Sequence, residues 1–166
     1  MDRRSLLAGL GTAGLGVSLL PIAKLSAAEG QGGATIVYSY LAAWNFHSVE
    51  RAARYFSDDV VYFDASVGEP VVGKEAATSD VVANFINAVP DLTWGIRGAP
   101  IVMGERVAFE WEFAGTNTGA WVDGTAASNK RFRFPGASVF EIRDGLIVHQ
   151  ADYYDALGFY KQLGWI

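Results

Sequence analysis

The chain has 166 residues, of which 51% are hydrophobic and 13% aromatic, so it can bury one sizeable core but hardly two. It contains no cysteine, which excludes disulfides, thiolate metal sites and a cysteine nucleophile. Its 18 acidic side chains outnumber the 13 basic ones and no basic run occurs, so nucleic acid is not expected as a partner.

The first 28 residues have the three-part layout of an export signal. Arg3 and Arg4 form the charged start, an uncharged apolar stretch follows, and small residues fit cleavage after Ala28. The paired arginines, the glycines in the apolar stretch and Lys24 near the cut favour the twin-arginine route. We therefore expect a periplasmic or extracellular protein, with an ordinary secretory signal or an uncleaved anchor as the alternatives. Because the apolar stretch is rich in glycine and short of the ~20 residues that span a bilayer, no stable membrane span is expected in the mature form.

The first half of the remaining chain has the apolar spacing of helices. A glycine-rich lead at residues 29–34 is expected to be flexible, and apolar residues then recur at helical spacing as far as residue 56, with a break at 45–48. A short strand at 60–64 and a third helix at 74–89 follow.

From Pro90 the pattern becomes strand-like, with many aromatic and β-branched residues. Asp144-Gly145 predicts a tight turn between the last two strands. We expect strands at 92–96, 106–116, 131–143 and 146–154, and a final helix at 156–163. Helices followed by a meander of strands indicate one α+β domain over residues 35–166.

Five segments carry a family resemblance. They are AAWNFHSVERAARYFSDDVVYFD, VVGKEA, FAGTNTG, VFEIRDGLIVHQADYYD and LGFYKQLG. Together, over about residues 35–164, they resemble the nuclear transport factor 2-like superfamily, in particular its SnoaL-like polyketide cyclase and limonene-epoxide hydrolase branches. The resemblance implies a cone, in which a strongly curved antiparallel sheet wraps around N-terminal helices and encloses a central pocket, commonly in a homodimer. Because the superfamily includes enzymes and purely structural members, the function depends on the pocket.

An aspartate, Asp152, lies inside the last predicted strand. Aspartate is depleted in strands, and an unpaired buried carboxyl tends to take up a proton. Its raised pKa would let it exchange protons near neutral pH, as acid–base catalysis requires. The resemblance places Asp152 where both branches keep their acid–base aspartate. The alternative is a solvent-facing or salt-bridged side chain.

The turn at Asp144-Gly145 predicts which residues lie beside Asp152. A regular two-residue turn pairs Ala137 with Asp152 and puts Gln150 on the same side of the hairpin, with Phe140 on the other side. Neither side is cleanly apolar, and the resemblance assigns the pocket to the Asp152 side.

Tyr62 and Asp64 alternate with Phe63, so both lie on one face of the predicted strand. In the epoxide-hydrolase branch the matching positions carry a tyrosine and an asparagine that hold the attacking water. Asp64 replaces the amide and offers a second carboxyl instead; the alternative is that it only starts a turn. That branch also needs an arginine and an aspartate where this chain has Trp111 and Phe113, which argues against epoxide hydrolysis.

Asn117 stands where many SnoaL-like proteins have a histidine. The aromatic residues Tyr40, Trp44 and Trp111 can form pocket walls, or simply core. The two histidines are not at ligand spacing, so neither a metal site nor a cofactor is expected. We predict catalytic roles for Asp152, Tyr62 and Asp64, and substrate contacts for Tyr40, Trp44, Trp111, Asn117 and Gln150.

These residues predict an exported, cofactor-free enzyme that performs acid–base chemistry on a small apolar cyclic or polyketide-like molecule. The reaction would be a cyclisation, an isomerisation or a dehydration. The alternative is a noncatalytic module of the same fold that holds an apolar ligand or dimerises.

Overall fold

The computed structural model describes residues 22–166. Most of the expected export signal, at residues 1–21, lies outside the described residues. None of the helices in the described part is both long enough and apolar enough to cross a membrane.

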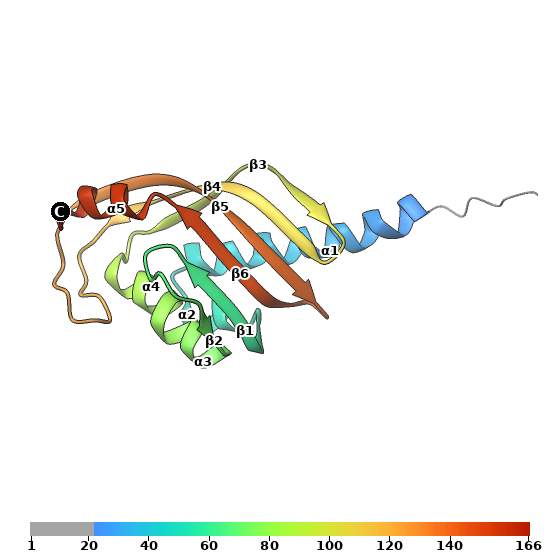
Figure 1. The fold of residues 1–166 in the computed structure, drawn as a ribbon, viewed down its shortest axis with the longest axis horizontal. Helices are drawn as coiled ribbons and strands as arrows, with labels where there is room; N and C mark the ends of the chain where they lie inside the picture. Colours follow the sequence, from blue (N-terminus) through green and yellow to red (C-terminus); the bar gives the residue numbers. More distant parts are fainter. Residues whose placement is uncertain (1–21) are drawn as a thin grey trace, which may run out of the picture.

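Five helical segments and two strands occupy the first half of this part, and four strands and a closing helix occupy the second (Figure 1). The first half consists of α1 (Ile22–Asn45), α2 (Val49–Ala53), β1 (Phe56–Asp64), β2 (Val71–Val72), α3 (Lys74–Ala76), the π-helical segment η1 (Ala77–Ala83) and α4 (Asn84–Ala88). The second half consists of β3 (Thr93–Met103), β4 (Arg106–Thr116), β5 (Arg131–Arg143), β6 (Leu146–Tyr154) and α5 (Ala156–Leu163).

The strands form one curved sheet in the order β2-β1-β6-β5-β4-β3, with α1 to α4 on its concave side (Figure 1). This confirms the α+β class. The sheet is mixed rather than purely antiparallel, because β1 pairs with β6 in the parallel sense. Parallel neighbours need a long crossover connection, and the chain between Asp64 and Leu146 supplies it.

The glycine-rich lead, predicted to be flexible, is helical, since α1 begins at Ile22. A Cβ on Gly33 would lie 3.0 Å from the Val107 side chain, so glycine permits α1 to approach β4 closely here. Helix propensity is a weak preference that tertiary packing overrides. Two strands are also longer than expected, since β1 starts at Phe56 and β3 continues to Met103.

The hairpin of β5 and β6 contains an irregularity that the sequence did not predict. Asp144 and Gly145 both have positive φ, 51° and 77°, as a tight hairpin turn requires. One extra residue on β6 then shifts the register between Glu141 and Ile142, as a β-bulge does. Asp152 therefore pairs with Ser138 and not with Ala137.

The bulge also corrects the predicted faces. Phe140 pairs with Gln150 and is fully buried, so it shares the concave face with Gln150 and Asp152 and does not lie on the opposite one. The concave face and the helices together bury a mainly aromatic core, whose largest fully buried members are Trp44, Tyr40, Tyr62, Phe56, Phe140 and Phe159.

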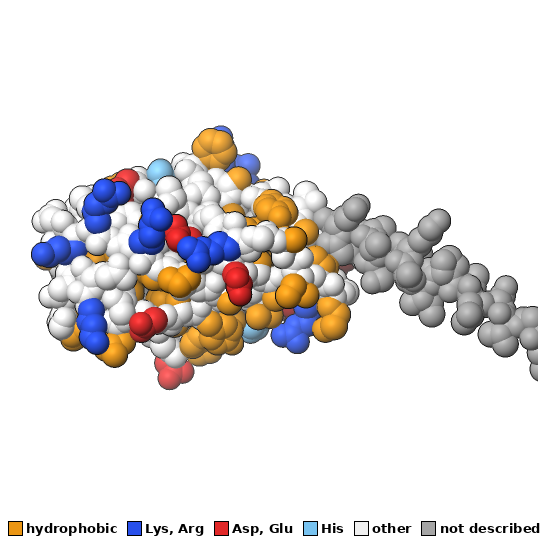
Figure 2. All heavy atoms as spheres, turned by 90° about the horizontal axis from the view of Figure 1, so that it is seen from above, with side chains coloured by type: hydrophobic (Ala, Val, Ile, Leu, Met, Phe, Trp, Pro, Cys, Tyr) orange, Lys and Arg blue, Asp and Glu red, His pale blue; other side chains and the backbone are white. Residues whose placement is uncertain are grey.

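Figure 2 views the molecule from above Figure 1 and shows basic, acidic and hydrophobic side chains interspersed. Arg97 and Arg133 both pair with Glu112 from neighbouring strands. Exposed pairs of this kind contribute about 0 to 1 kcal/mol each, so the stability of the fold depends on the aromatic core.

Candidate active site

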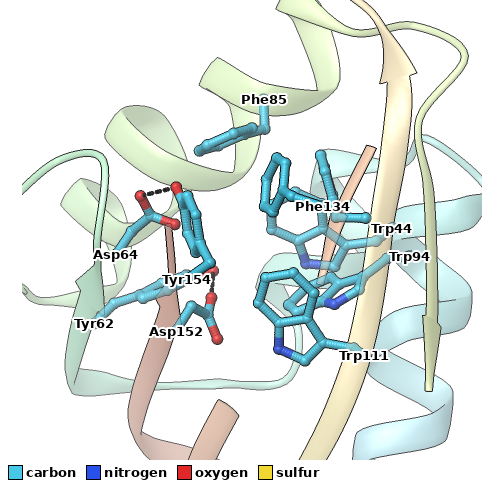
Figure 3. Close-up of a pocket in the computed structure, with 10 residues that line it drawn as sticks. Trp44, Tyr62, Asp64, Phe85, Trp94, Trp111, Phe134, Asp152 and Tyr154 are labelled. Carbon is cyan, nitrogen blue, oxygen red and sulfur yellow. Dashed lines mark hydrogen bonds between the residues drawn. The ribbon is translucent and has the colours of Figure 1, made fainter. Parts of the chain in front are cut away.

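A narrow cavity lies between the concave face of the sheet and the helices. Figure 3 shows two unlike sides, with carboxyl and phenol groups from β1 and β6 facing indole and phenyl rings. The rings approach so closely that little of the space is wide enough for a water molecule. The lining residues are Trp44, Tyr62, Asp64, Phe85, Trp94, Trp111, Phe113, Phe134, Asp152 and Tyr154.

Asp152 is 3% exposed, and both of its carboxylate oxygens accept hydrogen bonds. The Tyr62 hydroxyl donates to Oδ2 at 2.7 Å and the Gln150 amide donates to the same oxygen at 2.9 Å. The Ser138 hydroxyl donates to Oδ1 at 2.5 Å. None of the salt bridges among residues 22–166 involves Asp152, so the predicted burial is confirmed and the solvent-facing and salt-bridged alternatives are wrong.

Burial and, after it, the nearby charge of Asp64 raise the pKa of Asp152 to about 7, although the three hydrogen bonds act in the opposite direction. Loss of hydration disfavours the charged form more than neutral donors can restore it. A carboxyl that titrates there can both accept and release a proton at neutral pH.

Ser138 and Trp111 extend the hydrogen-bond network of Asp152. The Trp111 indole N–H donates to the Ser138 hydroxyl oxygen at 2.7 Å. A hydroxyl has a single hydrogen, so Ser138, while accepting from Trp111, directs that hydrogen to Asp152. Ser138 was not predicted as a site residue, because only the bulge brings it opposite Asp152. Trp111, predicted as an aromatic wall, also acts as a donor.

Asp64 lies beside Asp152, since the two are register partners on β1 and β6. It is 4% exposed, and burial raises its pKa. Its Oδ1 accepts from the Ser66 amide at 2.8 Å, from the Ser66 hydroxyl at 2.6 Å and from the Tyr154 hydroxyl at 2.8 Å. The structure therefore combines both interpretations of Asp64, because the same side chain starts a turn and lines the cavity.

The tyrosines of the site are protonated donors. Burial, followed by the charge of Asp152, raises the pKa of Tyr62 well above its ordinary value. Burial and the charge of Asp64 likewise raise the pKa of Tyr154. Tyr154 was not predicted, although its alternation with Asp152 on β6 would have placed it on the same face.

The remaining predicted contacts divide into two groups. Trp44 lines the cavity, whereas Tyr40 and Gln150 lie behind the lining residues, both fully buried. Asn117 is not among the lining residues. Its amide donates to the backbone oxygens of Ala88 and Gly119 and accepts from the Ser128 amide, so it fixes the loop after β4, and the predicted substrate contact receives no support.

No group of three or more histidine, aspartate or glutamate side chains in the described part of the chain is arranged to hold a metal ion. His47 has its Nε2 2.9 Å from the Leu92 backbone oxygen, which ties the break between α1 and α2 to the start of β3.

Residues 37–150 match the sequence profile of the SnoaL-like domain. No curated protein sequence matches the chain at a significant level. Many solved structures share its fold. A proposed SnoaL-like polyketide cyclase from Jannaschia sp. CCS1 gives a TM-score of 0.69 at 15% identity, over 81% of this chain and 92% of that one.

Two further structural neighbours differ in activity or in bound ligand. An LEH-like epoxide hydrolase of M. tuberculosis gives a TM-score of 0.61 at 20% identity, over 82% of this chain and 92% of its own. A protein with a ketosteroid isomerase-like fold from Catenulispora acidiphila, solved with trimethylamine, gives a TM-score of 0.65 at 23% identity, over 78% of this chain and 92% of that one. These likenesses confirm the nuclear transport factor 2-like fold.

Proposed function

Since the chain belongs to the SnoaL-like domain family, we propose that it is an enzyme in which Asp152 carries a proton to and from a small cyclic or polyketide-like substrate. One observation supports this most strongly: a buried carboxyl with a pKa raised to about 7 lines a cavity whose other walls are mainly aromatic. Such a group is matched to proton transfer at neutral pH.

The proposed step is a proton transfer at a carbon next to a carbonyl group. Asp152 takes the proton, the electron pair of the broken C–H bond moves toward the carbonyl oxygen, and an enol or enolate forms. When Asp152 becomes protonated, the Tyr62 hydroxyl no longer faces a full charge and can turn its hydrogen to the substrate oxygen. If a carbon–carbon double bond is conjugated with the enolate, return of the proton from Asp152 to the far carbon of that double bond completes an isomerisation. If a hydroxyl group stands on the β-carbon, hydroxide leaves and takes up the proton from Asp152 as water, which is a dehydration. Attack of the enolate carbon on a second carbonyl closes a ring, and the new alkoxide takes the proton from Asp152.

Solvent deuterium exchange tests this proposal without knowledge of the natural substrate. A panel of cyclic ketones is incubated in D₂O with the full chain, and exchange at the α-carbon is followed by NMR. We expect faster exchange than in buffer for at least one ketone, a loss of about 100-fold or more in Asp152→Asn, and a smaller loss in Tyr62→Phe. Undiminished exchange in a folded Asp152→Asn variant would remove Asp152 from the mechanism.

A second candidate is a noncatalytic module that holds a small molecule in the same cavity. Two observations favour it: both oxygens of Asp152 are already hydrogen-bonded, and the Catenulispora neighbour was solved with a small ligand. Native mass spectrometry of protein taken from its own host distinguishes the two. A stoichiometric, unaltered ligand supports the binding module.

We also propose export by the twin-arginine route with cleavage after Ala28, and assembly as a homodimer. Fusion of residues 1–28 to a reporter should direct export, and replacement of both Arg3 and Arg4 by lysine should block it. A monomeric mass in native mass spectrometry would contradict the dimer.

A further inference from the structure

The two carboxyls of the cavity differ in how many of their oxygens are free. Both oxygens of Asp152 accept hydrogen bonds. All hydrogen bonds from described residues to the carboxylate of Asp64 go to Oδ1. Oδ2 accepts no hydrogen bond from the described residues. It is not fully enclosed by other atoms either, so it remains accessible to a ligand. Figure 3 shows Asp64 with one oxygen bonded to Tyr154 and the other directed toward the aromatic side.

The charge around Asp64 is unbalanced. The titratable groups that act on it, or on which its charge acts, are Asp152 and Tyr154 from β6, Tyr62 from β1 and Tyr160 from α5. All four are acids, and none of the described residues lining the cavity is basic. The charge of each ionised carboxyl is therefore left without a counter-ion inside the protein, which a buried charge normally has.

The opposite wall is suited to a positive charge. The rings of Trp44 and Trp94 have centroids 5.1 Å apart, and those of Trp94 and Trp111 lie 5.8 Å apart, both in edge-to-face contact. A cation within about 6 Å of an indole face is attracted by the ring quadrupole, and aromatic cages recognise ammonium groups in this way. The cavity thus combines indole rings with an open carboxylate oxygen.

We propose that the ligand of this cavity carries an ammonium group on a small apolar body, with Asp64 Oδ2 as the acceptor of its N–H hydrogen and the indole wall around its carbons. The inference rests on the proposed function only in taking this cavity as the ligand site. It assigns Asp64 to ligand binding and leaves proton transfer to Asp152.

The test compares three six-membered-ring probes that differ in one substituent: cyclohexylammonium, cyclohexanol and methylcyclohexane. Binding to the full chain is measured by calorimetry at about pH 8, where the raised carboxyl pKa values still leave an ionised population. We expect cyclohexylammonium to bind about tenfold or more tightly than cyclohexanol, and methylcyclohexane most weakly. Asp64→Asn should reduce the preference for the cation to about twofold.

Asp58→Asn is the matched control. Asp58 is exposed on the same strand as Asp64, so this variant changes the net charge equally without touching the cavity, and the preference should be retained. Proton release gives a measurement that needs no variant. Because a bound cation favours the ionised carboxyls, cyclohexylammonium should release protons on binding at about pH 6.5, and cyclohexanol should not. Calorimetry in buffers of different ionisation enthalpy measures this release.

Equal affinity for the ammonium and the alcohol, absence of binding, or binding without proton release would overturn the inference. Its failure is distinguishable from failure of the proposed catalysis. Binding as described with no effect of Asp152→Asn on deuterium exchange would remove only the catalytic role. Loss of exchange in Asp152→Asn without a preference for the cation would remove only the ammonium ligand.

Discussion

Replacement of Ser138 by alanine tests the hydrogen-bond chain from Trp111 through Ser138 to Asp152. The variant removes the donor to Asp152 Oδ1, which lies 2.5 Å away, and leaves the Trp111 indole N–H, now 2.7 Å from its acceptor, without a partner. Loss of the hydrogen bond to Oδ1 destabilises the charged form of Asp152 more than its neutral form. The destabilisation from the unpaired indole N–H is independent of pH.

The two losses have different magnitudes. A hydrogen bond to a charged group contributes about 1.5 to 3 kcal/mol, and a neutral one about 0.5 to 1.5. The ionised state of Asp152 should therefore lose about 1 to 2 kcal/mol more than the neutral state, so the pKa of Asp152 should rise further by roughly 0.7 to 1.5 pH units. The orphaned indole N–H adds about 1 to 3 kcal/mol at every pH.

Urea denaturation at about pH 5 and about pH 9 separates these terms. Ser138→Ala should lose about 1 to 2 kcal/mol more stability at the higher pH. Ser57→Ala is the control, because the Ser57 hydroxyl is buried without a hydrogen-bond partner; its loss should be small and equal at both pH values. An equal loss in Ser138→Ala at the two pH values would refute the claim that Ser138 stabilises an ionisable Asp152.

Three further predictions concern single side chains. The folded pKa of Asp152 is raised from 3.8 to about 7, so the native state binds more protons than the unfolded chain. The protonated side chain therefore contributes about 4 kcal/mol to the free energy of unfolding below about pH 4, and this contribution is lost as the pH rises to about 7. In urea titrations the free energy of unfolding of Asp152→Asn should depend less on pH over that range and should exceed that of the unmodified chain above it. Gly136→Ala places a Cβ 2.2 Å from the Trp111 ring and should destabilise by about 3 kcal/mol or more in thermal unfolding, whereas Gly95→Ala, whose Cβ meets nothing within 4 Å, should change stability by less than about 1 kcal/mol. Asn117→Ala should lower stability by about 2 to 4 kcal/mol through its lost loop contacts while ligand affinity, followed by calorimetry, stays unchanged; a selective loss of affinity would restore its predicted binding role.

Local patterns predicted most helices and strands, because period 3.6 and period 2 depend on which side chains a segment buries. Residues 106–116, 131–143, 146–154 and 156–163 are elements in the structure with the expected bounds. The boundaries that moved depend on distant partners. Residues 56–59 extend β1, where Phe56 pairs with Ile147, and residues 29–33 join α1, where Gly33 meets Val107.

The surroundings of Asp152 could not be predicted, because they depend on a bulge. A one-residue shift reverses which side chains share a face, so a regular hairpin predicted Ala137 opposite Asp152 and missed Ser138. Nothing in a single sequence shows that β6 carries one residue more than β5 over this stretch.

The position of Asp64 beside Asp152 could not be predicted from the sequence either, for a different reason. Alternation correctly placed it with Tyr62, but its distance from Asp152 depends on the parallel pairing of β1 with β6, which joins segments nearly ninety residues apart. The Asx-type turn at Ser66 was recognisable from the sequence. That the same turn leaves Oδ2 open toward the cavity follows only from the structure.

The central claim is that Asp152 is a buried carboxyl able to exchange a proton near neutral pH. Titration of ¹³C-labelled aspartate carboxyls by NMR measures this directly, with the Asp152 signal identified by its absence in Asp152→Asn. We predict a midpoint at about pH 7, well above that of the exposed aspartates at about 4. A midpoint for Asp152 at or below that ordinary value would show that the group is ionised throughout the neutral range, and the proposed proton transfer would be contradicted.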